Sequence, residues 1–176
     1  TAWTAAAGVP VTINFNGLAS TTSPYTTEYL AGITLDGVTF ISFDGVGSPN
    51  LMAYGPLSSA GNWGSGDYLR GGYAPGYLLA TISGSGTTAI GFDLMSFSAG
   101  KSITVTFSSG EVRSIATSTA PNRVFFGVIS DTPITSVQFA GNGAFTLLDN
   151  FSYLQAEETP EAGTLLLGGI GLALLA

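Results

Sequence analysis

The sequence predicts an all-β fold, an antiparallel β-sandwich of jelly-roll type. Only 9% of the 176 residues are charged, too few for the solvent-facing sides of a helical bundle. The chain also holds 25 Gly and 8 Pro, which divide it into short segments. Between residues 10 and 154 these segments are rich in Val, Ile, Thr, Phe and Tyr, and none has a helical repeat over three turns.

Each predicted strand combines β-branched or aromatic residues with a flanking turn signal. After Val11–Asn16, the dipeptide Asp36-Gly37 marks a tight turn between Gly32–Leu35 and Val38–Phe43. Later, Ile103, Val105 and Phe107 alternate with polar residues before Ser109-Gly110 turns the chain into Val112–Thr117, so this hairpin has one apolar face. The other predicted strands are Tyr77–Ile82, Ala89–Phe97, Val124–Ile129, Thr135–Ala140 and Phe145–Leu154.

The residue types present exclude the common catalytic and metal chemistries. The chain has no His and no Cys, so it offers no imidazole base, no thiolate and no ordinary zinc, haem or iron–sulfur site. Its formal charge of −7 would repel phosphate backbones, which argues against nucleic acid as a partner. Residues 1–8 have no charged region followed by a long apolar core, so a mature or processed start is expected.

The stretch from Gly45 to Gly76 is expected to form a long loop region at one end of the sandwich, because Gly, Pro and Ser crowd it. Aromatic rings in or beside such loops can present flat apolar faces to a sugar. The candidate ligand-binding rings are Trp63, Tyr68, Tyr73 and Tyr77. The same rings can instead close over the core of a small domain, and the sequence leaves both interpretations open.

The composition changes after Leu154. Residues 1–154 form the predicted β-sandwich domain, residues 155–162 an acidic spacer with one proline, and residues 163–176 an apolar tail without charge. As a helix the tail would reach about 21 Å, short of the about 30 Å of a bilayer's hydrocarbon core.

The junction Glu158-Thr159-Pro160-Glu161-Ala162-Gly163 and the apolar run after it resemble the PEP-CTERM sorting signal of bacterial surface proteins. Pro160-Glu161 matches that family's Pro-Glu-Pro core, but Ala162 stands where the second Pro usually stands, and the basic end is missing. The body is similar to β-sandwich ectodomains with such tails, at residues 91–94, 125–128 and 148–153. The resemblance implies export across the inner membrane, exosortase processing and a place at the cell surface or in the extracellular matrix.

Burial of the tail would favour self-association, because its leucines and isoleucine represent about 10–20 kcal/mol of gross apolar burial. We therefore expect a homopolymer or filament in which the tail docks into the next subunit. An ordinary membrane anchor or a core strand is the competing interpretation of the tail. The predicted sorting and assembly residues are Pro160, Glu161, Leu165, Leu166, Leu167, Ile170, Leu172, Leu174 and Leu175.

The resemblance to jelly-roll modules also implies a structural calcium near the final strand, at Asp149. Asn16 and Glu28 are further candidate oxygen ligands if the first and last strands are adjacent. The competing interpretation is that Asp149 caps a turn or accepts a backbone hydrogen bond.

These features together predict a non-catalytic structural protein of the cell surface, a biofilm matrix or an extracellular filament. The alternative is a carbohydrate-binding module for extracellular polysaccharide that uses the four candidate rings. A surface hydrolase would need two loop carboxylates, drawn from Glu28, Asp44 and Asp67. No nucleophile elbow or phosphate-binding loop occurs in the sequence, so we expect no enzymatic activity.

Overall fold

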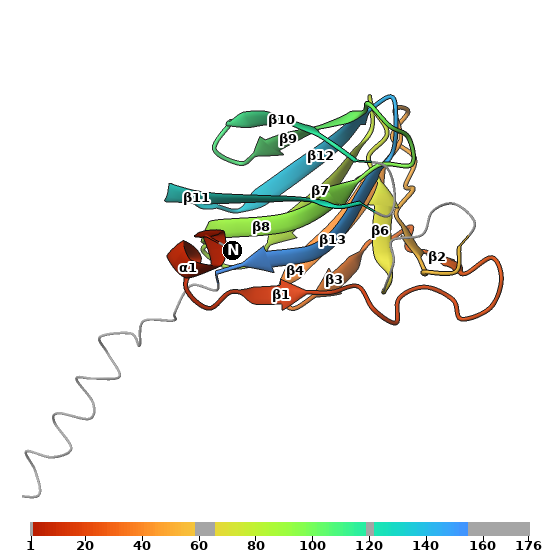
Figure 1. Cartoon of the computed structure of the whole chain (residues 1–176), viewed down its shortest axis with the longest axis horizontal. Helices are drawn as coiled ribbons and strands as arrows, with labels where there is room; N and C mark the ends of the chain where they lie inside the picture. The colour runs from red at the N-terminus through yellow and green to blue at the C-terminus, as the bar shows by residue number, and fades with distance from the viewer. Residues whose placement is uncertain (1, 59–65, 119–121, 155–176) are drawn as a thin grey trace, which may run out of the picture.

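A computed structural model describes residues 2–58, 66–118 and 122–154, and this part of the chain is a sandwich of two antiparallel β-sheets (Figure 1). The predicted fold class is therefore confirmed. The spacer, the tail and Trp63 lie outside the described residues, so self-association and sorting through the tail stay predictions.

The first sheet contains, in spatial order, β11 (Val124–Ile134), β8 (Thr87–Met95), β13 (Thr146–Tyr153), β6 (Tyr68–Gly71), β5 (Met52–Tyr54) and β2 (Thr26–Glu28). A further strand, β1 (Val11–Ile13), also pairs with β13. The second sheet has the order β10 (Val112–Ala116), β9 (Ser102–Phe107), β12 (Ser136–Asn142), β7 (Tyr77–Ile82), β4 (Val38–Phe43) and β3 (Ile33–Leu35). The short helix α1 (Ala2–Ala7) precedes β1.

The core fills the space between the sheets, and strands such as β4 and β9 supply it with alternate residues. In β4, Val38 and Phe40 are fully buried while Thr39 and Ile41 between and beyond them are not. Rings from both sheets meet edge to face at the centre: Phe40 packs on Phe151 with centroids 5.4 Å apart, and Phe92 on Phe139 at 4.9 Å. These contacts fix the two layers against each other.

Strand β13 lies at the centre of the first sheet and changes partner along its length. Its residues 146–148 pair with β6, and its residues 151–153 pair with β1. Between the two stretches the register shifts at Asn150, which has a left-handed backbone (φ 48°). The first and last strands are therefore adjacent, which is the condition under which Asn16 and Glu28 are candidate ligands beside Asp149.

The prediction of one long loop from Gly45 to Gly76 is wrong in part. Strands β5 and β6 lie within this stretch, and they place Ala53 and Leu69 in the core. Each strand is only three or four residues long, too short to show alternation in the sequence.

The two ends of the sandwich differ in what covers them (Figure 1). At one end, α1 rests on β11, where the Nε1 of Trp3 donates a hydrogen bond to the Val128 carbonyl at 3.2 Å. At the other end lie β2 and β6, together with the connection from β1 to β2. None of the described helices is long and apolar enough to cross a membrane.

Candidate functional site

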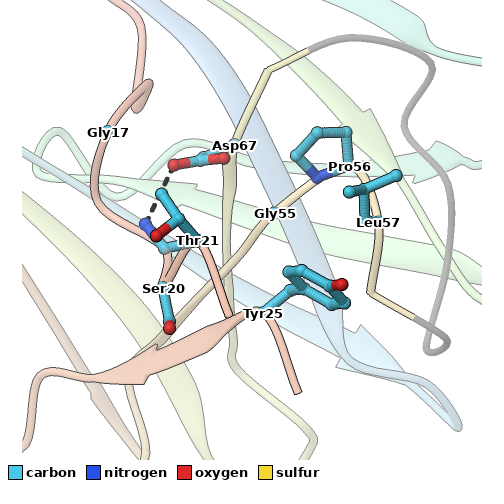
Figure 2. A pocket seen from close by; sticks show the side chains of 9 residues that line it. Gly17, Ser20, Thr21, Tyr25, Gly55, Pro56, Leu57 and Asp67 are labelled. Carbon is cyan, nitrogen blue, oxygen red and sulfur yellow. Dashed lines mark hydrogen bonds between the residues drawn. The ribbon is translucent and has the colours of Figure 1, made fainter. Parts of the chain in front are cut away.

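A pocket of about 280 Å³ opens at the β2 and β6 end of the sandwich. One wall comes from the connection between β1 and β2, and the other from the residues that follow β5 and precede β6 (Figure 2). The lining residues are Gly17, Ala19, Ser20, Thr21, Tyr25, Gly55, Pro56, Leu57 and Asp67. The sandwich thus brings together two stretches that lie far apart in the sequence.

Among the described residues of this lining, Asp67 is the only charged one, and hydrogen bonds hold both its backbone and its side chain. Its side-chain Oδ2 accepts a hydrogen bond from the Ala19 N–H at 2.9 Å, which is drawn in Figure 2. Its backbone N–H donates to the Oδ1 of Asn16 at 3.1 Å. Asp67 is only 9% exposed, so its carboxylate is a fixed and largely desolvated hydrogen-bond acceptor.

Gly66 makes this arrangement sterically possible. Its backbone is left-handed (φ 80°), and a Cβ there would lie 2.3 Å from the Oδ1 of Asn16. Only glycine accommodates both the left-handed backbone and the close approach of the Asn16 side chain. The close approach brings the connection after β1 against the start of β6.

Tyr25 supplies the aromatic part of the pocket. Its N–H donates to the Thr22 carbonyl at 2.7 Å, and its own carbonyl accepts from the Gly55 N–H at 2.9 Å. This second bond continues the pairing of β2 with β5 by one residue. In the view of Figure 2, the Asp67 carboxylate lies on one side of Gly55, and the Tyr25 ring and Leu57 lie on the other.

Tyr29 stabilises the connection between β1 and β2, which forms one wall of the pocket. Its hydroxyl donates to the Leu18 carbonyl at 2.8 Å. Burial raises the pKa of Tyr29, and the negative charge of Asp67 adds to the increase. The phenol therefore stays protonated and keeps donating at neutral pH, which anchors the backbone next to Ala19.

The predicted aromatic platform does not exist as one surface. Tyr68 is fully buried in a small apolar cluster separate from the main core, and it stacks on Tyr54 with ring centroids 5.7 Å apart. Tyr77 belongs to the second sheet, where it packs against Phe43 at 5.8 Å. The two rings lie in opposite layers, so the prediction that they share a stacking surface is wrong.

Of the other two candidate rings, Tyr73 is 43% exposed and leans on Phe145, with centroids 5.1 Å apart, while Trp63 lies outside the described residues. The competing interpretation, in which these rings cover protein, is correct for Tyr68. Its phenol has a pKa well above the usual value, because burial disfavours the charged form and neighbouring Tyr54 adds to the effect.

The predicted calcium site is also wrong, because its three ligands do not converge. Glu28 lies in β2, and β5 and β6 separate that strand from β13 and Asp149. Three strand spacings correspond to about 14 Å, whereas calcium ligands lie about 2.3–2.6 Å from the ion. Asn16 holds the backbone of Asp67 instead. Within the described residues, no cluster of three acidic side chains with metal-binding geometry occurs.

Asp149 instead belongs to a charge-compensated cluster. Its Oδ1 accepts from the Asn150 N–H at 2.7 Å, as the competing interpretation of this residue proposed. The Nη1 of Arg123 lies 3.6 Å from the Oδ2 of Asp93 and 3.7 Å from that of Asp149. The Nδ2 of Asn150 also donates to Asp93 at 2.8 Å. This cluster ties β8 to β13 and to the residue preceding β11.

The carboxylates considered for hydrolysis do not assemble in the pocket. Asp44 follows β4 in the second sheet, and its Oδ1 accepts from the Val46 and Ser48 N–H groups at 3.0 and 2.8 Å. It is absent from the pocket lining, as is Glu28. The described lining therefore contains one carboxylate, whereas glycoside hydrolysis ordinarily uses two.

The sequence matches no protein-family model and no curated protein. Among solved structures, it is similar to a family 29 carbohydrate-binding module, a mutant of CBM29-2 complexed with mannohexaose, at 17% identity and a TM-score of 0.40 over 83% of this chain and 92% of that one. Another structure described as a family 29 carbohydrate-binding module has 21% identity and a TM-score of 0.36, over 66% and 88%.

A third similar structure is a family 43 glycoside hydrolase, an arabinoxylan arabinofuranohydrolase from Bacillus subtilis in complex with cellotetraose. The identity is 12% and the TM-score 0.36, over 51% of this chain. The match spans 21% of the hydrolase chain. Similarities this distant assign no individual residue of the present chain to a site.

Proposed function

We propose that this protein is a non-catalytic carbohydrate-binding module whose ligand enters the pocket beside Asp67. The observation that carries the proposal is a fixed carboxylate, 9% exposed, that lines a cavity together with the ring of Tyr25. Sugar hydroxyls are donors that suit a carboxylate, and the apolar face of a pyranose suits an aromatic ring. A single carboxylate in the lining favours binding over hydrolysis.

The rigidity of the pocket supports the same proposal. Hydrogen bonds fix Asp67 at its backbone and at one carboxylate oxygen, and Tyr25 at its N–H and its carbonyl. A ligand that enters a preorganised pocket loses less affinity to the ordering of side chains and loops. The pocket also sits on the connections at one end of a stable sandwich, where β proteins commonly bind ligands.

The test is a glycan microarray with the full chain, followed by isothermal titration calorimetry with the sugars that bind. Asp67→Asn keeps the shape but turns a charge-assisted hydrogen bond into a neutral one, a loss of about 1–1.5 kcal/mol, or roughly tenfold in Kd. Asp44→Asn is the matched control, since it removes the same charge from a carboxylate that also accepts backbone hydrogen bonds. Its affinity should equal that of the unmodified protein.

Two results would overturn the proposal. One is the absence of binding to any saccharide on the array or at millimolar concentration in solution. The other is an equal loss of affinity in the Asp67→Asn and Asp44→Asn variants, since that would assign the effect to overall charge. Assembly through residues 163–176 is a separate proposal that rests on their apolar sequence, and a chain without them that still polymerises would refute it.

A further inference from the structure

We infer that the pocket takes the terminal residue of a glycan and that this residue carries no acidic group. The inference rests on the proposed function and narrows the ligand to neutral and amino sugars. Uronic acids and sulfated sugars are excluded as occupants of the pocket. Two properties of the pocket lead to this conclusion, its charge and its size.

The charge of the pocket is purely negative. Asp67 is the one charged residue in the lining, and no Lys or Arg lines the pocket among the described residues. Arg70 is three residues further along the chain, but its guanidinium lies 3.6 Å from the centroid of the Phe145 ring, and its Nη1 donates to the Tyr54 hydroxyl at 3.2 Å. It is therefore engaged elsewhere on β6.

An acidic sugar would meet Asp67 without a countercharge. Like charges placed together at an interface oppose binding strongly, and partial burial of Asp67 reduces screening by water. The whole chain adds to this repulsion, because its formal charge is −7. A hydroxyl or an ammonium group at the same place would instead donate a charge-assisted hydrogen bond.

The size of the pocket limits the ligand to about one sugar residue. Its volume of about 280 Å³ is at the lower end of the range for small-molecule sites, about 300–1,000 Å³. At Gly55 a Cβ would already lie 3.4 Å from both the Oδ1 of Asp67 and the Cβ of Ala19, and 3.5 Å from the Tyr25 carbonyl oxygen. Asp67, Ala19 and the Tyr25 backbone thus surround Gly55 at contact distance, and a glycan whose terminal residue fills a pocket of this volume extends outward from it.

The charge is tested by calorimetry at pH 7 with three sugar pairs that differ only at C6: glucose and glucuronic acid, galactose and galacturonic acid, mannose and mannuronic acid. We expect at least one neutral sugar to bind and its acidic counterpart to bind at least tenfold more weakly. In Asp67→Asn the affinity for the neutral sugar should fall and the affinity for the acidic sugar should rise, so that the ratio of the two affinities becomes smaller. Asp44→Asn should leave the ratio unchanged.

Binding of the terminal residue is tested by measuring how many protein molecules bind to each glycan chain. The glycans are linear oligomers of four and eight units of the sugar that binds. Occupation by a terminal residue predicts the same number of protein molecules per oligomer at both lengths. A number that doubles with length would overturn the inference, as would an acidic sugar that binds as tightly as its neutral counterpart. Either result leaves carbohydrate binding intact, whereas failure of all saccharides to bind overturns both the inference and the proposed function.

Discussion

Replacing Asn16 by Ala should weaken ligand binding by displacing Asp67. The lost interaction is the 3.1 Å hydrogen bond between the Oδ1 of Asn16 and the N–H of Asp67. A neutral hydrogen bond of this kind contributes about 0.5–1.5 kcal/mol to the free energy of unfolding. For a domain of this size, 1 kcal/mol corresponds to a fall in Tm of about 2–4 °C. Among the described residues, Ala19 then remains as the hydrogen-bond partner of Asp67, so affinity for the sugar should fall about three- to tenfold.

Thermal unfolding followed by circular dichroism measures the first effect, and calorimetry with the best-binding sugar measures the second. Asn14→Ala is the control, because the Oδ1 of Asn14 makes only a long 3.4 Å contact with the Asn16 N–H in an exposed setting. We expect its Tm and affinity to match those of the unmodified protein. If Asn16→Ala lowers Tm but leaves affinity unchanged, Asn16 does not position the carboxylate and the reasoning is refuted.

Three further outcomes follow from other parts of the fold. Gly127→Ala places a Cβ 2.5 Å from the Trp3 ring, so it should detach α1 and lower the free energy of unfolding by about 1–3 kcal/mol. Tryptophan emission should shift to the red, and an unchanged spectrum would contradict this prediction. Calcium and EDTA should each leave Tm unchanged, and a rise in Tm with calcium would restore the metal site. Burial raises the pKa of Tyr153, and the negative charge of Asp36 adds to the increase. The free energy of unfolding should therefore hold below about pH 10 and fall as the pH rises through the folded-state pKa. Thermal melts at pH 8–11 should show this fall, and it should be less steep in Tyr153→Phe.

The strands were predictable wherever their local pattern matched their final environment. Val38–Phe43 and Tyr77–Ile82 have the predicted bounds, because each lies inside a sheet with one face on the core. Strand β11 shows the limit of this reasoning. It continues past Ile129 through Pro133, and a proline without an N–H is tolerated there because β11 is an edge strand. That position in the sheet is not visible in the local sequence.

The pocket was less predictable than the fold, because long-range contacts create it. Asp67 was identifiable as a loop carboxylate, but its partners Asn16 and Ala19 are 51 and 48 residues away. Tyr25 carried no signal of its own, because a single tyrosine after Ser-Pro indicates only a turn. The sequence pointed instead to a group of rings near Tyr68, but Tyr68 lies in β6 of the first sheet and Tyr77 in β7 of the second.

The small number of basic residues connects the composition with the proposed selectivity. Three of the four Lys and Arg residues of the chain make contacts elsewhere: Arg123 lies between Asp93 and Asp149, Arg70 covers Phe145, and Arg113 pairs with Glu111. Asp93, Asp149 and Glu111 thus receive a countercharge, while Asp67 accepts a hydrogen bond from a backbone N–H and no cation is among the described residues of the lining. A carboxylate held in this way keeps its full attraction for donors in the ligand and its full repulsion of anions. In this chain a basic residue introduced at the pocket rim, such as Leu57→Lys, should therefore admit acidic sugars, and calorimetry with glucuronic acid would show whether it does.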